Sequence, residues 1–113
     1  MSIPLTLNLL QGSVSFRFTP EAAQGIKAEI DMLMASMRAI AGSSAPSRPA
    51  PKKPMEYQHT GDIFLEIFCN PNIYPSPFAA KVLITLRDER IRLTSEAELP
   101  RLLEDLDNYL AQA

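Results

Sequence analysis

The sequence predicts an α+β fold in which an antiparallel sheet of about five strands carries two helices on one of its faces. Several short segments alternate apolar and polar residues, as half-buried strands do. Two longer segments repeat apolar residues at helical spacing, and turn-forming residues separate the segments. The expected order is strand, strand, helix, linker, strand, strand, strand, helix.

A hairpin followed by a long helix is predicted in the first 40 residues. Apolar side chains alternate with polar ones in segments 5–9 and 14–18, and the turn between them contains Gly12. Thr19 is a suitable N-cap, and Pro20 suits the first helical position because its missing N–H needs no partner there. The apolar stripe of this helix consists of Ile26, Ile30, Leu33, Met37 and Ile40.

Residues 41–61 are predicted to form a flexible linker, because prolines and serines crowd this segment and disfavour regular structure. The 113 residues are expected to form a single domain, since this length suits one hydrophobic core. The linker then separates a half with two strands and a helix from a half with three strands and a helix.

Three strands and a helix are predicted after the linker. Segment 62–69 is apolar on both faces, which is typical of a central strand, and segment 82–93 has the alternation of a second hairpin. Ser95 and Glu98 have the spacing of a capping box that starts the last helix. Pro100 is then expected to weaken the second turn of that helix.

Segments 14–22 and 89–97 resemble each other, because both alternate apolar residues and then reach a threonine and a glutamate. The likeness favours two similar units of hairpin and helix around one core. The alternative is that two unrelated hairpins, each followed by a capped helix, have converged on the same pattern. The likeness carries no information about chemistry.

Composition and charge restrict the class of protein. The net charge of −2 gives no bulk attraction to membranes or nucleic acids, so no membrane partner is expected and nucleic acid is the less favoured partner. No segment approaches the roughly 20 apolar residues of a membrane span, and no signal peptide is evident. The single cysteine, Cys69, cannot form an intrachain disulfide, which suits a reducing compartment. We therefore expect a cytoplasmic protein.

The sequence contains no pattern of catalytic residues. His59 and Cys69 have no acid placed to orient them as a base and a nucleophile. One histidine and one cysteine cannot build a usual zinc site, and no glycine-rich phosphate loop is present. The chain is therefore expected not to be an enzyme and to need neither a metal nor a cofactor.

Aromatic and arginine side chains are predicted on the face of the sheet that points away from the helices. Such a face fits a protein interface with aromatic and arginine anchors, or a site on which the bases of a single-stranded nucleic acid stack. A third interpretation is that the linker or a loop covers the face and the rings belong to the core. If the rings are exposed, a homodimer through the sheet or its edge is also expected. The candidate residues are Arg17, Phe64, Phe68, Arg90 and Arg92.

The loop 70–78 is the second candidate for contact with a partner. Its prolines restrict the chain and lower the entropy that is lost when its side chains bind. The alternative is that these side chains fold back and close one end of the core. The candidates are Ile73, Tyr74 and Phe78.

The sequence therefore predicts a non-catalytic protein-interaction domain, such as an adapter, an assembly factor or a small regulatory subunit. It would bind a protein partner through the open sheet face and the 70–78 loop. The alternative is a single-strand nucleic-acid-binding module, against which the acidic last helix and the net negative charge count.

Overall fold

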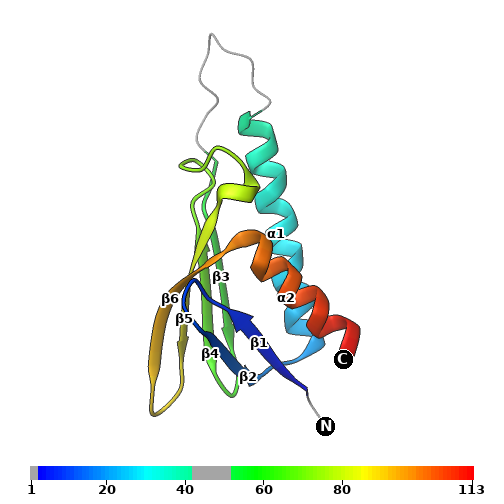
Figure 1. Ribbon diagram of the computed structural model, residues 1–113, viewed down its shortest axis with the longest axis vertical. Helices are drawn as coiled ribbons and strands as arrows, with labels where there is room; N and C mark the ends of the chain where they lie inside the picture. The colour runs from blue at the N-terminus through cyan, green and yellow to red at the C-terminus, as the bar shows by residue number, and fades with distance from the viewer. Residues whose placement is uncertain (1–2, 42–51) are drawn as a thin grey trace.

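The computed structural model describes residues 3–41 and 52–113 and has the predicted α+β fold (Figure 1). This part of the chain contains two helices and six strands, and the strands form two antiparallel sheets. The predicted sheet of about five strands is thus divided into a sheet of four strands and a sheet of two. Both helices lie on the same side of the four-stranded sheet (Figure 1).

The larger sheet is a meander of β3 (Met55–Thr60), β4 (Phe64–Cys69), β5 (Lys81–Arg87) and β6 (Arg92–Glu98). Its last three strands correspond to the three strands predicted after the linker. Side chains alternate along each strand between an inner face, which packs toward the helices, and an outer face. The inner face supplies core residues that are at most 4% exposed: Leu65, Ile67, Val82, Ile84, Leu86 and Ala97.

The prediction of a linker over 41–61 is wrong at its C-terminal end, because residues 55–60 form β3. The prolines stop before this strand, but most of its six residues are polar, so the sequence carries only a weak signal for a strand. Residues 42–51 lie outside the described residues. The inward residues of β3 are Met55, Tyr57 and His59.

The smaller sheet is a hairpin of β1 (Pro4–Asn8) and β2 (Ser13–Arg17). Gly12 in its turn has a φ of 88°, a left-handed conformation that glycine adopts without strain. Two strands alone are only marginally stable in water, so the hairpin depends on what its apolar side packs against. That side carries Leu5, Leu7 and Phe16, all of which are buried.

The first helix, α1 (Pro20–Ala41), begins where the sequence predicts. The Oγ1 of Thr19 accepts a hydrogen bond from the backbone N–H of Ala22 at 3.2 Å. The Tyr57 hydroxyl donates to the carbonyl of Ala22 at 3.3 Å, which attaches the first turn of the helix to β3. Four residues of the predicted stripe are at most 3% exposed: Ile26, Ile30, Leu33 and Met37.

The last helix, α2 (Leu99–Gln112), begins directly after β6 and later than the sequence predicts. Ser95 and Glu98 lie within the strand, so the prediction of a capping box is wrong. Pro100 occupies the first turn of the helix. Its missing N–H breaks no helical hydrogen bond there, so the proline suits the helix start instead of weakening a later turn.

The two similar segments, 14–22 and 89–97, differ in structure at the point where the helices begin. Thr19 caps α1, whereas Thr94 lies within β6. Both segments nevertheless belong to a hairpin that is followed by a helix.

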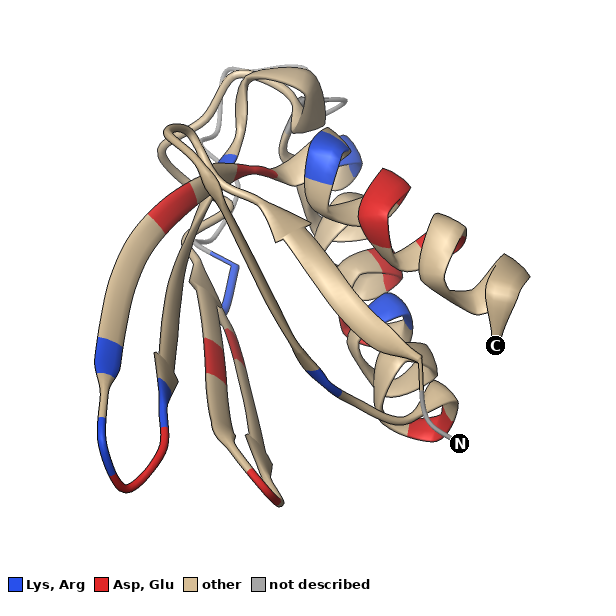
Figure 2. Ribbon diagram, turned by 60° about the horizontal axis from the view of Figure 1, so that its bottom comes forward, with Lys and Arg blue, Asp and Glu red and all other residues tan. Residues whose placement is uncertain are grey.

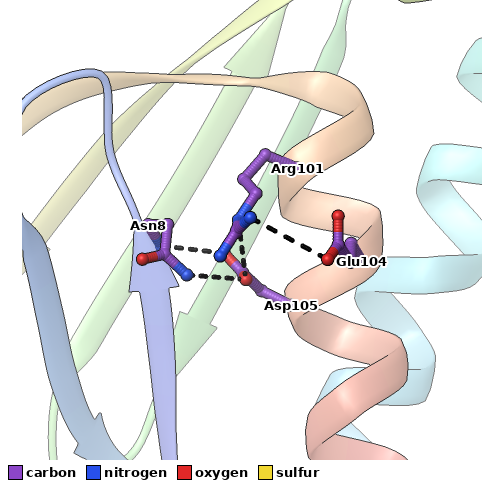
Figure 3. Close-up of polar contacts among 4 residues, drawn as sticks. All are labelled: Asn8, Arg101, Glu104 and Asp105. Atoms are coloured by element: carbon purple, nitrogen blue, oxygen red, sulfur yellow. Dashed lines mark hydrogen bonds and ion pairs between the residues drawn. The ribbon is translucent and has the colours of Figure 1, made fainter.

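One buried carboxylate joins α2 to the hairpin (Figure 3). Asp105 is 5% exposed, and its two oxygens accept hydrogen bonds from the backbone N–H and the Nδ2 of Asn8, both at 2.8 Å. The Nε of Arg101 lies 3.3 Å from the same carboxylate and supplies a positive charge. One turn later, the Tyr109 hydroxyl donates to the carbonyl of Phe18 at 2.8 Å. These contacts hold the hairpin against α2.

We predict that Asp105→Ala lowers the free energy of unfolding by about 1–3 kcal/mol, because it leaves two part-buried donors of Asn8 without their acceptor. Glu104→Ala is the matched control, since Glu104 is exposed and reaches Arg101 only at 3.8 Å. The control should change the free energy of unfolding by about 0–0.5 kcal/mol. Urea denaturation followed by circular dichroism measures both, and equal effects would contradict the role of Asp105.

Candidate functional site

The outer face of the four-stranded sheet carries three rows of side chains, which the strand register places side by side. We call them the apolar row (Phe68, Leu83 and Glu96), the middle row (Glu66, Thr85 and Thr94) and the arginine row (Phe64, Arg87 and Arg92). The edge strand β3 extends them with Glu56, Gln58 and Thr60. Figure 2 shows basic residues on both strands beside the β5–β6 turn, acidic residues within the turn itself, and acidic residues toward the other end of β6. The face therefore has a basic end and an acidic, partly apolar end.

The apolar row and the 70–78 loop together border a shallow hollow of about 180 Å³. Phe68 and Leu83 are 36% and 42% exposed, and Ile73 of the loop is 66% exposed. Tyr74 also lines the hollow and is half-buried against the core. The structure thus brings three of the predicted site residues together, namely Phe68, Ile73 and Tyr74, and adds Leu83 to them.

Hydrogen bonds to one asparagine hold the 70–78 loop in place. The backbone N–H of Asn72 donates to the Oδ1 of Asn70 at 3.0 Å, which forms a local turn. The Asn72 side chain bonds both backbone groups of Lys52, at 2.8 Å and 2.7 Å. Pro71 between them is fully buried. The loop therefore displays Ile73 from a fixed backbone, and of its three candidate side chains only Tyr74 packs against the core.

The arginine row pairs charge with an aromatic ring. Phe64 is half-buried, and the guanidinium carbon of Arg87 lies 4.3 Å from its ring centroid, in a cation–π contact. Arg87 is directly opposite Arg92 on the neighbouring strand, and like charges in such a pair repel. In the part of the chain that the structure describes, neither arginine forms an ion pair within the 4.0 Å limit. This row therefore presents positive charge without an acidic partner.

The remaining predicted residues lie apart from the hollow. Arg17 is on β2 in the two-stranded sheet, so the prediction that it shares the face with Phe64 and Phe68 is wrong. Arg90 lies in the β5–β6 turn, where the Asp88 carboxylate accepts bonds from two backbone N–H groups that lower the pKa of Asp88. Phe78 is 84% exposed in a short 3₁₀ helix, η1 (Pro77–Ala79), and does not border the hollow.

The two side chains best suited to chemistry, His59 and Cys69, pack toward the core, although Cys69 also borders the hollow. The ring of His59 packs edge-on against Phe18, with 4.8 Å between the ring centroids. Cys69 is 1% exposed, and burial raises the pKa of its thiol to about 11. Among the described residues, no group of three or more histidine, cysteine, aspartate or glutamate side chains could hold a metal ion. The outer face and the loop therefore form a contact surface of rings, aliphatic side chains and arginines.

Leu83 and Arg87 complete this surface, although neither was among the candidate residues. The alternation of β5 places both on the outer face, so the sequence contained a signal for them. Comparison with protein-family models, with curated proteins and with solved structures finds no match to this chain. No helix in residues 3–41 or 52–113 is long and apolar enough to cross a membrane. Function is therefore inferred from the side chains of the outer face and the loop.

We predict that native Cys69 reacts with iodoacetamide at pH 9 at least about 50-fold more slowly than the unfolded chain does, because only the thiolate reacts. Burial raises the pKa of Cys69 from 9.0 to about 11, so in the folded protein the Cys69 thiol stays protonated at pH 9. Between these values only the unfolded chain releases the proton, so stability falls as pH rises through this window. Mass spectrometry of samples with and without urea measures the rates, and similar rates would contradict a buried thiol.

Proposed function

We propose that this chain is a non-catalytic protein-interaction domain, such as an adapter, an assembly factor or a small regulatory subunit. It binds a protein partner through the outer face of the four-stranded sheet and the 70–78 loop. The observation that supports the proposal best is the contiguity of three exposed apolar side chains, Phe68, Ile73 and Leu83, around one hollow. Contiguous apolar patches of this kind mark interaction sites, whereas single exposed apolar residues do not.

The composition of the surface also supports a protein partner. Protein interfaces combine an apolar or aromatic centre with a polar rim, and arginine is enriched in them. Here Phe68, Leu83 and Ile73 form the centre, Glu96 lies at its border, and Arg87 stands at the other end of the same face. Hydrogen bonds already hold the loop around Asn72, so little conformational entropy would be lost when Ile73 becomes buried.

Acidic side chains on the same face disfavour the nucleic-acid alternative. Glu56, Glu66 and Glu96 point outward with Phe68 and Leu83, so a nucleic-acid backbone would meet negative charge beside the rings. The arginines gather at the other end of the strands and are separated from Phe68 by the middle row. Binding of nucleic acid is therefore one possible result of the capture experiment below.

We also propose a cytoplasmic setting, because the single cysteine is buried and unpaired, which suits a reducing compartment.

We predict that Phe68→Glu combined with Leu83→Glu reduces capture of the partner from lysate by at least about tenfold, because charges enter the centre of the interface. Both side chains lie on the outer face and are partly exposed, so the variant should keep the far-ultraviolet spectrum and cooperative thermal melting of a folded chain. Met32→Glu on α1 is the matched control, since Met32 is 65% exposed and lies outside the outer face.

The capture is performed with the tagged chain in native lysate, with and without nuclease, and is read by mass spectrometry. A protein that survives nuclease, is retained by Met32→Glu and is lost with the double variant supports the proposal. Loss of all captured material after nuclease favours the nucleic-acid alternative. A folded double variant that captures the same proteins as the wild type overturns the proposed surface.

A further inference from the structure

Two strands of the outer face, β4 and β6, are self-complementary about the middle row, whereas on β5 the same symmetry sets Leu83 against Arg87. On β6, Arg92 and Glu96 stand two residues on either side of Thr94. On β4, Phe64 and Phe68 stand two residues on either side of Glu66, which shares the middle row with Thr94. A half-turn about an axis along the middle row therefore exchanges an arginine with a glutamate and one phenylalanine with the other.

We propose that the outer face binds a second copy of this chain, packed face to face with its strands running in the opposite direction. In this arrangement Arg92 meets Glu96 of the partner subunit, and Phe64 meets Phe68 of the partner subunit. Each contact occurs twice, as a two-fold interface requires. The inference rests on the proposed function because it assigns an occupant to the same surface.

Unpaired groups on the outer face support this occupant. Arg87 and Arg92 face each other across the strand register, and in the described part of the chain neither forms an ion pair. Stacked sheets lie about 10 Å apart, a distance that extended arginine and glutamate side chains together can span. The partner's Glu96 would relieve the repulsion between the arginines, and the second sheet would cover the exposed side chains of Phe68 and Leu83.

The free edge of β6 is less suitable for the second copy. Antiparallel pairing of two β6 strands about Thr94 would also bring Arg92 opposite the partner's Glu96. The backbone N–H of Asp88 donates to the carbonyl of Ile91, so the backbone groups of odd-numbered residues in β6 bond to β5. The backbone N–H and C=O groups of its even-numbered residues therefore point toward the free edge. At this edge the carbonyl of Glu96 already accepts the N–H of Leu10 at 3.0 Å. The β1–β2 turn thus occupies one end of the edge, and a strand paired across Thr94 would collide with it.

The size of the face sets the strength of the dimer. Four strands of five residues cover about 19 by 17 Å, which is well below the roughly 800 Å² per partner of a standard interface. Glu66 also lies on the proposed axis and would face the partner's Glu66, although Gln58 donates to it at 2.8 Å. We therefore expect weak self-association, with a dissociation constant of about 10–100 μM.

The test uses two charge reversals, Arg92→Glu and Glu96→Arg, in sedimentation equilibrium of the full chain at about 0.5 mM, several times the expected dissociation constant. The wild type should be largely dimeric, and each variant alone should be monomeric because like charges meet twice. A mixture of the two variants in equal amounts should restore the dimer. In the mixed dimer one contact joins the two introduced charges and the other joins the two native ones, and both are attractive. Arg17→Glu, in the other sheet, is the charge-matched control and should dimerise as the wild type does.

A wild type that stays monomeric overturns the inference, and so does a dimer that both single variants keep or that the mixture does not restore. Native mass spectrometry with one variant isotopically labelled shows whether the restored dimer contains one copy of each. If the wild type is monomeric while Phe68→Glu with Leu83→Glu still loses a captured protein, the proposed function stands and the occupant is a different chain. If the wild type is monomeric and capture is also unchanged, both proposals are wrong.

Discussion

The contact between the buried Asp105 carboxylate and Asn8 fixes the hairpin on α2, and the layered packing of the molecule depends on that attachment. A two-stranded hairpin has too little apolar surface to be stable alone, and this one is held by α2 through a carboxylate that accepts two hydrogen bonds from Asn8. With the hairpin and α2 joined, the apolar sides of both, together with α1, pack toward the inner face of the four-stranded sheet. Among residues 3–41 and 52–113 no element covers the outer face, so its exposed side chains are available for contact.

The fold was predictable where a local signal and the tertiary structure agree. Strands β4 and β5 were found because apolar residues occupy their inward positions, and α1 was found because Thr19 is followed by a long apolar stripe. Strand β3 was missed because its inward positions hold only two apolar residues, Met55 and Tyr57, before the polar His59. The start of α2 was misplaced because Ser95 and Glu98 fit a cap as well as an edge strand. Only the pairing of these residues with β5 distinguishes a strand from a helix cap, and that pairing joins segments distant in the sequence.

The candidate site was predictable in composition but not in arrangement. Alternation along β4 placed Phe68 on the outer face, and the same argument applied to Leu83. Which loop residue is exposed could not be derived, because it depends on the bonds from Asn72 to Lys52, twenty residues earlier in the chain. The position of Arg17 depended on whether the hairpin joins the larger sheet, and that is decided by packing against α2.

The direct passage of β6 into α2 gives the outer face a mechanical connection to the hairpin on the far side. Glu98 is the last residue of the strand and Leu99 is the first of the helix, so no flexible residue separates them, and Pro100 further stiffens the junction. Because Asp105 on α2 bonds Asn8 of β1, an unbroken run of hydrogen-bonded backbone connects the strand that carries Arg92 and Glu96 to the hairpin.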